Sequence, residues 1–319
     1  MPMPILAFVL FAGLMSGATA QTWPERQVRV VVPYAAGSVP DILARLIFDP
    51  VRESTGRPFV VENRPGAAGM IGTEAVAKAV PDGHSLVFAP AGPLVTNKLL
   101  YRKMSYDPMR DLAPVALVAE APTILVAGND VRAKDARELL VEMADPGRRL
   151  AYASPGHGTL GHLAMAFLVS RSGGNVPHAP YPGSPQIVAS LIAGDVHLAA
   201  LPPPAVAPSI KAGKIKALAV VGPKRNTTLP DLPTLKEQGI DFDRIGWFGI
   251  ATTAGTPAQV VERIHREIES ALRVPQVVKA YAKFGMEVGD KGPAAFAAYM
   301  QDELREWEPV IRKNNITLD

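Results

Sequence analysis

Short apolar runs alternate with segments of helical periodicity along most of the chain. The run at residues 28–33 predicts a buried strand, and the apolar positions Ile42, Leu43, Leu46 and Ile47 predict a helix after it. Asp41, just before these positions, has the residue type and place of a helix N-cap. This strand and helix form the first unit of a repeated β–α pattern.

The same pattern continues to the end of the chain. Further strands are predicted at residues 59–62, 85–89, 150–153, 176–180, 196–201, 215–221 and 246–252. Helices are predicted at residues 71–80, 134–144, 159–170, 184–193, 205–212 and 258–272, and the remainder is mostly helical through residue 313. Strands that alternate with helices are typical of parallel α/β layers, so the predicted fold class is α/β.

Three loops between predicted strands and helices carry the candidate chemistry. They occupy residues 33–41, 154–159 and 181–185, and each contains a glycine or proline turn that leads into a helix. A helix N-terminus offers free backbone N–H groups and a positive dipole end, which suits an anion. None of the three loops contains Lys or Arg. They therefore predict a site for a small carboxylate rather than a polyphosphate.

The first 20 residues contain no charged side chain and have the pattern of a secretory signal. An apolar stretch at residues 5–15 precedes the small-x-small sequence Ala18-Thr19-Ala20, so cleavage is expected after Ala20. The stretch is short for a bilayer-spanning helix. The absence of cysteine excludes disulfides and thiolate metal sites. A periplasmic protein is predicted.

Charge and length narrow the function further. The 33 basic and 30 acidic residues are dispersed and give a formal charge of only +3, which does not indicate nucleic acid binding. The chain after residue 20 is long enough for two ordinary domains.

The segment Gly156-His157-Gly158-Thr159-Leu160-Gly161 matches G-x-G-x-x-G after a strand, a pattern found in dinucleotide-binding proteins. That function also needs an acidic residue about 20 positions later, and none occurs between Asp145 and Asp195. We therefore expect no nucleotide and no other cofactor, and interpret the loop as a carboxylate cradle made of backbone N–H groups and the Thr159 hydroxyl.

Enzymatic and metal-binding alternatives have weaker support. There is no G-x-S-x-G motif, and Ser154 and Ser184 have no recognisable base partner in the sequence. His157 and His162 are five residues apart, a spacing that does not put both on one helix face, so no metal site is expected. An exported α/β enzyme that acts on a carboxylate or ester remains the alternative function, and a structural protein without ligand is a third.

The order of motifs resembles the extracytoplasmic substrate-binding proteins of tripartite tricarboxylate transporters, the Bug family. The segments that carry the resemblance are Trp23-Pro24, Val30-Val31-Val32-Pro33-Tyr34, Asp41-Ile42-Leu43-Ala44-Arg45, Val61-Glu62-Asn63-Arg64-Pro65-Gly66-Ala67-Ala68-Gly69, Pro81-Asp82-Gly83, Tyr106-Asp107-Pro108, Tyr152-Ala153-Ser154, His162-Leu163-Ala164, Pro180-Tyr181-Pro182-Gly183-Ser184, Lys211-Ala212-Gly213-Lys214, Leu229-Pro230-Asp231-Leu232-Pro233-Thr234 and Trp247-Phe248-Gly249. They cover essentially the whole chain after residue 20.

The resemblance implies a type II periplasmic-binding-protein fold, in which two α/β lobes hold a ligand in the cleft between them. Lobe one would comprise residues 21–122 and 246–319, and lobe two residues 123–245, with crossings near 120–123 and 243–247. The implied function is capture of a small organic acid, without catalysis, for the membrane components of a tripartite transporter. We expect a monomer.

The expected ligand-binding residues come from the three loops and neighbouring strand ends. They are Tyr34, Ala36, Gly37, Ser38, Asp41, Ala91, Gly158, Thr159, His162, Tyr181, Gly183, Ser184 and Leu201. Three of them can also be explained by a structural role: Asp41 and Ser184 as N-caps, and His162 as a packing residue. Trp247 either lines the cleft or belongs to the core.

Three positions depart from the family pattern, and they bear on the ligand. Val39 stands in a loop where relatives usually have Gly-Gly-x-Thr-Asp, Met70 replaces a common asparagine, and Leu201 replaces a polar residue. If these side chains face the ligand, the cleft has lost hydrogen-bonding partners. We therefore expect an aromatic or weakly hydroxylated acid to bind more tightly than citrate.

Overall fold

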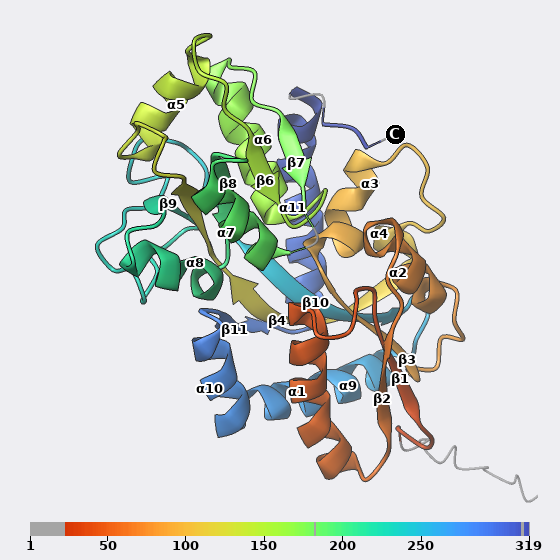
Figure 1. The fold of residues 1–319 in the computed structure, drawn as a ribbon. Helices are drawn as coiled ribbons and strands as arrows, with labels where there is room; N and C mark the ends of the chain where they lie inside the picture. The colour runs from red at the N-terminus through yellow and green to blue at the C-terminus, as the bar shows by residue number, and fades with distance from the viewer. Residues whose placement is uncertain (1–22, 182, 314–315, 319) are drawn as a thin grey trace, which may run out of the picture.

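The computed structural model describes residues 23–181, 183–313 and 316–318. The expected signal segment and its cleavage site after Ala20 lie outside the described residues. The described chain forms two β-sheets with helices packed against both faces of each (Figure 1). Within it, no helix combines the length and apolar character needed to cross a membrane.

The first sheet has six strands in the order β11-β4-β10-β3-β1-β2. Its strands are β1 (Val28–Val32), β2 (Phe59–Asn63), β3 (Ser85–Pro90), β4 (Leu112–Ala121), β10 (Gly246–Thr253) and β11 (Glu287–Lys291). The helical elements around it are α1 (Val39–Thr55), η1 (Ala67–Gly69), α2 (Met70–Ala77), η2 (Gly92–Thr96), α3 (Asn97–Leu100), α4 (Pro108–Asp111), α9 (Ala258–Leu272), α10 (Pro275–Lys283) and α11 (Pro293–Lys313).

Alternation along β1 shows how the first sheet is buried on two faces. Val30 and Val32 pack in a core cluster with α1 and α9, whereas Val31 packs on the opposite face with α2 and α11. Successive strand residues point to opposite faces, so a run of valines fits a sheet covered on both sides.

The second sheet has five strands in the order β7-β6-β8-β5-β9. Its strands are β5 (Thr123–Ala127), β6 (Tyr152–Ser154), β7 (His178–Pro180), β8 (Leu198–Leu201) and β9 (Lys216–Val221). Its helices are α5 (Ala136–Ala144), α6 (Leu160–Ser172), α7 (Ser184–Ala193) and α8 (Pro203–Lys211). α5 and α6 contribute to the core on one face, and α7 and α8 to the core on the other.

Two connections and one helix link the sheets. β4 ends at Ala121 and β5 begins at Thr123, so the chain passes from one sheet to the other at Pro122, and it returns between β9 and β10. α11 lies along both halves: Phe296 packs with the first sheet, while Trp307 packs in the cluster of the second (Figure 1).

The α/β prediction is confirmed, but both sheets are mixed rather than parallel. β4 and β11 are antiparallel to their neighbours in the first sheet, and β5 is antiparallel to β8 and β9 in the second. The sequence analysis missed these three strands. β4 and β5 are buried nearly throughout and therefore show little alternation, whereas β11 is a largely polar edge strand.

Candidate functional site

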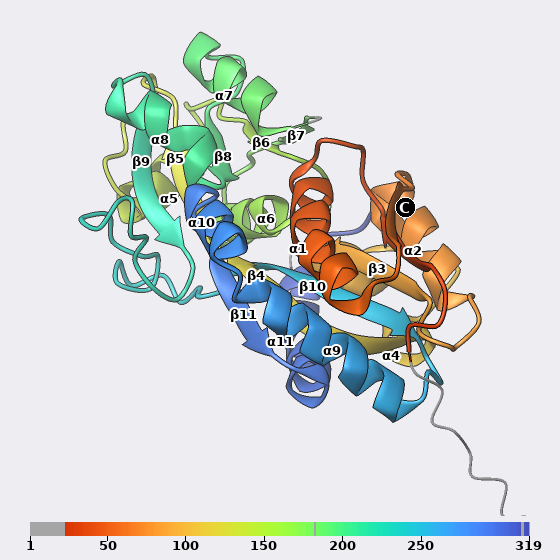
Figure 2. The same ribbon diagram turned by 90° about the horizontal axis from the view of Figure 1, so that it is seen from below.

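The three predicted loops follow the carboxyl ends of β1 in the first sheet and of β6 and β7 in the second sheet. The N-terminal end of α1, which follows the first loop, is directed toward the half that contains the second sheet (Figures 1 and 2). Direct contact between the halves occurs at the second loop, where the Thr96 hydroxyl donates to the Gly158 carbonyl at 3.4 Å. A Cβ built on Gly158 would lie 3.0 Å from Oδ1 of Asn97.

The first loop is held by Asp41, which is not the N-cap that the sequence predicted. α1 begins at Val39 with Ser38 as N-cap, because Pro40 has a backbone angle suited to the first helical turn. Asp41 therefore lies inside that turn and is buried. Its carboxylate accepts the Gly37 N–H at 2.8 Å, Arg45 Nε at 3.0 Å and Asn63 Nδ2 at 3.0 Å.

These hydrogen bonds give Asp41 a structural role in the first loop. Burial by itself would raise the pKa of the carboxyl group, but the bonds from Gly37, Arg45 and Asn63 lower the pKa below its ordinary value. Asn63 also donates to the Tyr34 carbonyl at 3.1 Å, so the same network fixes both ends of the loop. Ala36 and Gly37 are left exposed at its tip.

Tyr34 points into the protein, toward glycines of the first lobe. Cβ atoms built on Gly69 and Gly92 would lie 3.3 Å and 3.9 Å from its hydroxyl oxygen. Burial raises the pKa of this hydroxyl, with a smaller contribution from Tyr101. The hydroxyl is therefore protonated at neutral pH.

The turn at residues 66–69 has four successive residues with positive φ. Ala67 and Ala68 have φ values of 45° and 51°, an uncommon and strained conformation for residues with a Cβ, between Gly66 and Gly69. The Ala68 carbonyl accepts Nδ2 of Asn97 at 3.1 Å. Strain of this kind is concentrated at functional sites, and here it lies next to the contact between the two halves.

Asn97 is a candidate site residue that the sequence analysis missed. It is buried, and its Oδ1, which faces Gly158, has no hydrogen-bond partner among the described residues. The Ser38 hydroxyl at the start of α1 is likewise buried without a partner in the described chain. Buried polar atoms are normally paired, and Oδ1 of Asn97 is an acceptor, so it can take a donor such as a water molecule or a ligand hydroxyl. No local motif distinguishes Asn97 in the sequence.

Close packing and helix capping explain the residue types in the second loop. Gly156 and Gly158 have φ values of 136° and 74°, and a Cβ on Gly161 would lie 2.5 Å from the Ala200 carbonyl oxygen, where α6 crosses β8. The Thr159 side chain caps α6, because its oxygen accepts the His162 N–H at 3.3 Å and its hydroxyl donates to Gly156 at 2.8 Å.

Three histidines meet beside this loop. His157 precedes α6, His162 lies on it and His178 lies on β7, and one ring nitrogen from each is within 4.8 Å of the others. The spacing argument against a shared histidine site was wrong, because His157 lies in the loop and not on the helix. His162 Nδ1 accepts the Gly158 N–H at 3.2 Å.

Burial and repulsion between the rings keep the imidazoles of His162 and His178 uncharged. Burial, with smaller contributions from His178 and His157, lowers the pKa of His162 to about 3. Burial and His157 lower the pKa of His178 to about 4. Both rings are therefore neutral at pH 7, and their burial opposes protonation in acid.

The serine in the second loop has a partner that sequence reasoning did not find. Ser154 Oγ lies 2.8 Å from His178 Nε2 and 3.0 Å from the Gly156 carbonyl oxygen. Ser154 is fully buried. The pairing arises only because β6 and β7 are neighbours in the sheet, 24 residues apart in sequence.

The third loop and the strand ends supply the remaining predicted residues. Ser184 is the first residue of α7 and Gly183 is the N-cap, so the predicted capping by Ser184 is wrong; Pro185 in the first turn allows the earlier start. The Tyr181 N–H donates to the Ser154 carbonyl at 3.0 Å, which joins this loop to the second. Ala91 directly precedes η2.

Two predicted positions lie in the core. The Leu201 side chain is fully buried in the hydrophobic cluster beneath α7 and α8. Trp247 is also buried, packs edge-on against Phe296 and Tyr299, and donates through Nε1 to Glu303 at 3.2 Å. Of the two expected positions of Trp247, this geometry supports the one in the core.

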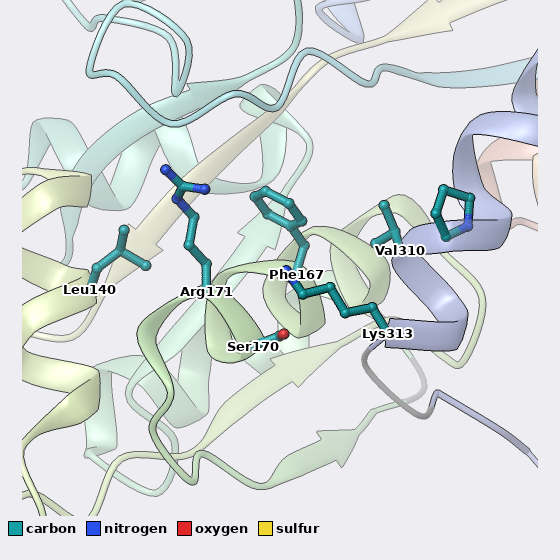
Figure 3. A pocket seen from close by; sticks show the side chains of 7 residues that line it. Leu140, Phe167, Ser170, Arg171, Val310 and Lys313 are labelled. Carbon is teal, nitrogen blue, oxygen red and sulfur yellow. The ribbon is translucent and has the colours of Figure 1, made fainter.

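A separate pocket of about 560 Å³ lies between α5, α6 and α11 (Figure 3). It is lined by Leu140 of α5, by Phe167, Ser170 and Arg171 of α6, and by Pro309, Val310 and Lys313 of α11. The described residues of the three loops do not contribute to it.

Mutation can distinguish the structural roles of the Thr159 and Ser184 hydroxyls. We expect Thr159→Ala to lower the free energy of unfolding by about 1 kcal/mol, because α6 loses its cap. Ser184→Ala is the matched control and should change stability little, since Ser184 is not a cap. Urea denaturation of both variants measures this. Equal losses of stability would contradict the assigned capping roles.

Two β-sheets covered by helices are joined by two chain crossings, and a glycine loop meets a buried amide oxygen without a partner among the described residues where the halves come together. This arrangement defines a two-lobed binding protein. The comparisons agree: the model of the family described as "Tripartite tricarboxylate transporter family receptor" matches residues 43–316. The chain belongs to this family, and its fold is that of a type II periplasmic binding protein.

Individual relatives are similar over nearly their full length. The "UPF0065 protein in tcbD-tcbE intergenic region" of Pseudomonas sp. strain P51 is 35% identical, over 96% of this chain and 93% of the relative. The solved structure "R. palustris Rpa4515 with adipate" has a TM-score of 0.82 and 32% identity, covering 92% of this chain and 99% of that one. The structure "MatC (Rpa3494) from Rhodopseudomonas palustris with bound malate" has a TM-score of 0.80 and 30% identity, covering 91% and 100%.

Proposed function

We propose that this protein is a periplasmic receptor that captures a small organic carboxylate and delivers it to the membrane components of a tripartite tricarboxylate-type transporter. The observation that carries the proposal is the meeting of the Gly158 loop, at the start of α6, with Thr96 and Asn97 of the other half, because a helix N-terminus suits an anion. The similar structures with adipate and malate support a carboxylate as ligand. The family and the expected signal segment support the periplasmic location.

The proposed capture step is closure of two lobes, residues 21–122 with 246–319 against residues 123–245. The Thr96–Gly158 contact joins a residue of each lobe, and the passage at Pro122 is a single residue between two strands. A ligand that contacts both lobes stabilises the closed state, because only closure brings both sets of donors to it.

The proposal includes no catalytic step. The Ser154–His178 pair is the strongest argument for an enzyme, yet Ser154 is fully buried and its Oγ lies between His178 and the Gly156 carbonyl. A general base works best with a pKa near the working pH, whereas the pKa of His178 is lowered to about 4. Incubation with the bound acid, followed by product analysis, should return the acid unchanged.

The absence of cations from the three loops bears on the ligand. A third carboxylate or an added hydroxyl would have fewer partners there, and an unpaired buried polar group costs about 1 to 3 kcal/mol. We therefore still expect adipate-type and benzoate-type acids to bind more tightly than citrate, by roughly ten-fold or more. Val39 and Met70 pack partly against the core and Leu201 lies within it, so the expectation now rests on the loops rather than on these side chains.

Calorimetric titration of the chain from residue 21 with adipate, malate, benzoate and citrate tests both the proposal and the preference. In the same assay Asn97→Ala should weaken the best acid by roughly ten-fold, because the Asn97 amide holds the turn at residues 66–69 against the Gly158 loop. Asn129→Ala is the control, since Asn129 is an exposed residue whose amide donates to Gly213 away from the loops. Binding of no acid would reject the proposal, and a clear preference for citrate would reject the predicted order.

A further inference from the structure

The histidine cluster has a chemistry that carboxylate capture does not require. His157, His162 and His178 come from a loop, a helix and a strand, and the fold alone brings them together. The ring centres of His162 and His178 are 4.4 Å apart, and His157 stands edge-on to both at 5.3 Å and 4.9 Å. Among the described residues, this is the group of histidines and acids whose ligand atoms converge closely enough for a metal ion.

The hydrogen bonds around the rings are compatible with metal binding. Ser154 Oγ contacts His178 Nε2 at 2.8 Å and the Gly156 carbonyl oxygen at 3.0 Å, and it accepts the Gly156 N–H at 3.3 Å. When Ser154 donates to Gly156, His178 donates through Nε2 and keeps a lone pair on Nδ1, as a metal-binding histidine does.

We propose that His157, His162 and His178 form a binding site for a divalent transition-metal ion of the zinc type. Three imidazole ligands with one open position suit the tetrahedral geometry of zinc. His157 is exposed, so an ion can enter from solvent. With zinc–nitrogen bonds of about 2.0 to 2.1 Å, the ligand nitrogens must approach to roughly 3.3 Å of one another, so the rings must move inward from their present separation of up to 4.8 Å.

Metal binding has a specific consequence for Gly158. His162 Nδ1 accepts the Gly158 N–H, and a metal on either ring nitrogen ends this bond, since Nδ1 must carry a proton if Nε2 binds the ion. The bond is long at 3.2 Å, and the glycines on both sides of His157 leave the loop backbone free to turn. The Gly158 amide then becomes available at the contact between the two halves. A dication there also supplies a positive charge that the three loops lack.

The test is titration of the untagged chain from residue 21 with zinc chloride, in a non-chelating buffer without carboxylates. We expect one ion per chain with a dissociation constant that is roughly micromolar or tighter. His157→Ala and His178→Ala should each weaken binding by about ten-fold or more, and the nuclear magnetic resonance signal of the Gly158 amide should shift on zinc addition. X-ray absorption at the zinc edge should report nitrogen ligands.

His265→Gln is the matched control, because His265 lies on α9 outside the cluster, and its zinc affinity should equal that of the unmodified chain. His157 is exposed, so its variant keeps the fold, which circular dichroism verifies. A dissociation constant weaker than about 1 mM, or binding that survives both cluster substitutions, would overturn the proposal. The assay contains no acid ligand, so a negative result rejects the metal site alone and leaves carboxylate capture to its own titration.

Discussion

Trp247→Ala is expected to lower the free energy of unfolding by about 4 kcal/mol, the largest loss predicted for a single substitution in this protein. Trp247 is buried on β10 and packs edge-on against Phe296 and Tyr299. Truncation removes this apolar contact area and leaves a cavity that the first sheet and α11 cannot readily close.

A second cost comes from Glu303. This buried carboxyl group accepts the indole N–H groups of Trp247 at 3.2 Å and Trp307 at 3.1 Å through the same oxygen. Burial raises the pKa of Glu303, and these two bonds oppose that rise. Loss of one donor therefore makes the ionised form more costly, so the deficit of the variant should grow as the pH rises above the ordinary glutamate range.

Denaturant unfolding of Trp247→Ala and Trp247→Phe measures these contributions separately. Phenylalanine keeps an aromatic ring in the core but has no N–H for Glu303, so we expect its loss to be clearly smaller than that of alanine. The affinity of either folded variant for the acid ligand should be close to that of the unmodified protein. A stable alanine variant with weakened acid binding would show that Trp247 lines the ligand site.

Asp41→Ala is expected to destabilise the protein by roughly 2 to 4 kcal/mol and to weaken acid binding as well. The substitution leaves three former donors without their acceptor, from Gly37, Arg45 and Asn63. The Gly37 bond holds the first loop against the start of α1, so its loss frees the loop that is proposed to face the ligand. The effect on binding is then one of positioning and not of a lost ligand contact.

The control is Asp49→Ala on the exposed side of the same helix. Its contact with Arg52 is 3.9 Å long and solvent-exposed, so we expect a change within about 0.5 kcal/mol. The pKa of Asp41 is lowered in the folded state, so its contribution is present above the ordinary aspartate pKa of about 3.9 and is lost as the pH falls through the folded-state value. The stability difference between the unmodified protein and Asp41→Ala should therefore shrink in acid. A difference that is independent of pH would contradict the assigned network.

The sequence by itself determined those features that arise from neighbouring residues. Helical periodicity predicted α9 at Ala258–Leu272 with its observed bounds, and apolar runs located β1 and β3 within a residue or so. Glycine and proline placed the loops before α1, α6 and α7. The motif order identified the family, which the comparisons confirmed. Local signals did misplace the start of α1 and the N-cap of α7, because proline is accepted in a first helical turn as readily as just before it.

Only the tertiary structure decided which distant residues meet. Asn97 acquires its role because η2 and α3 place it against Gly158, and Ser154 finds His178 because β6 and β7 are adjacent in the sheet. The three histidines converge for the same reason, and Trp247 lies in the core because α11 covers β10. Strand pairing and helix packing depend on contacts between segments far apart in the chain. A periodicity read within one segment cannot specify them, since the same apolar run fits several neighbours.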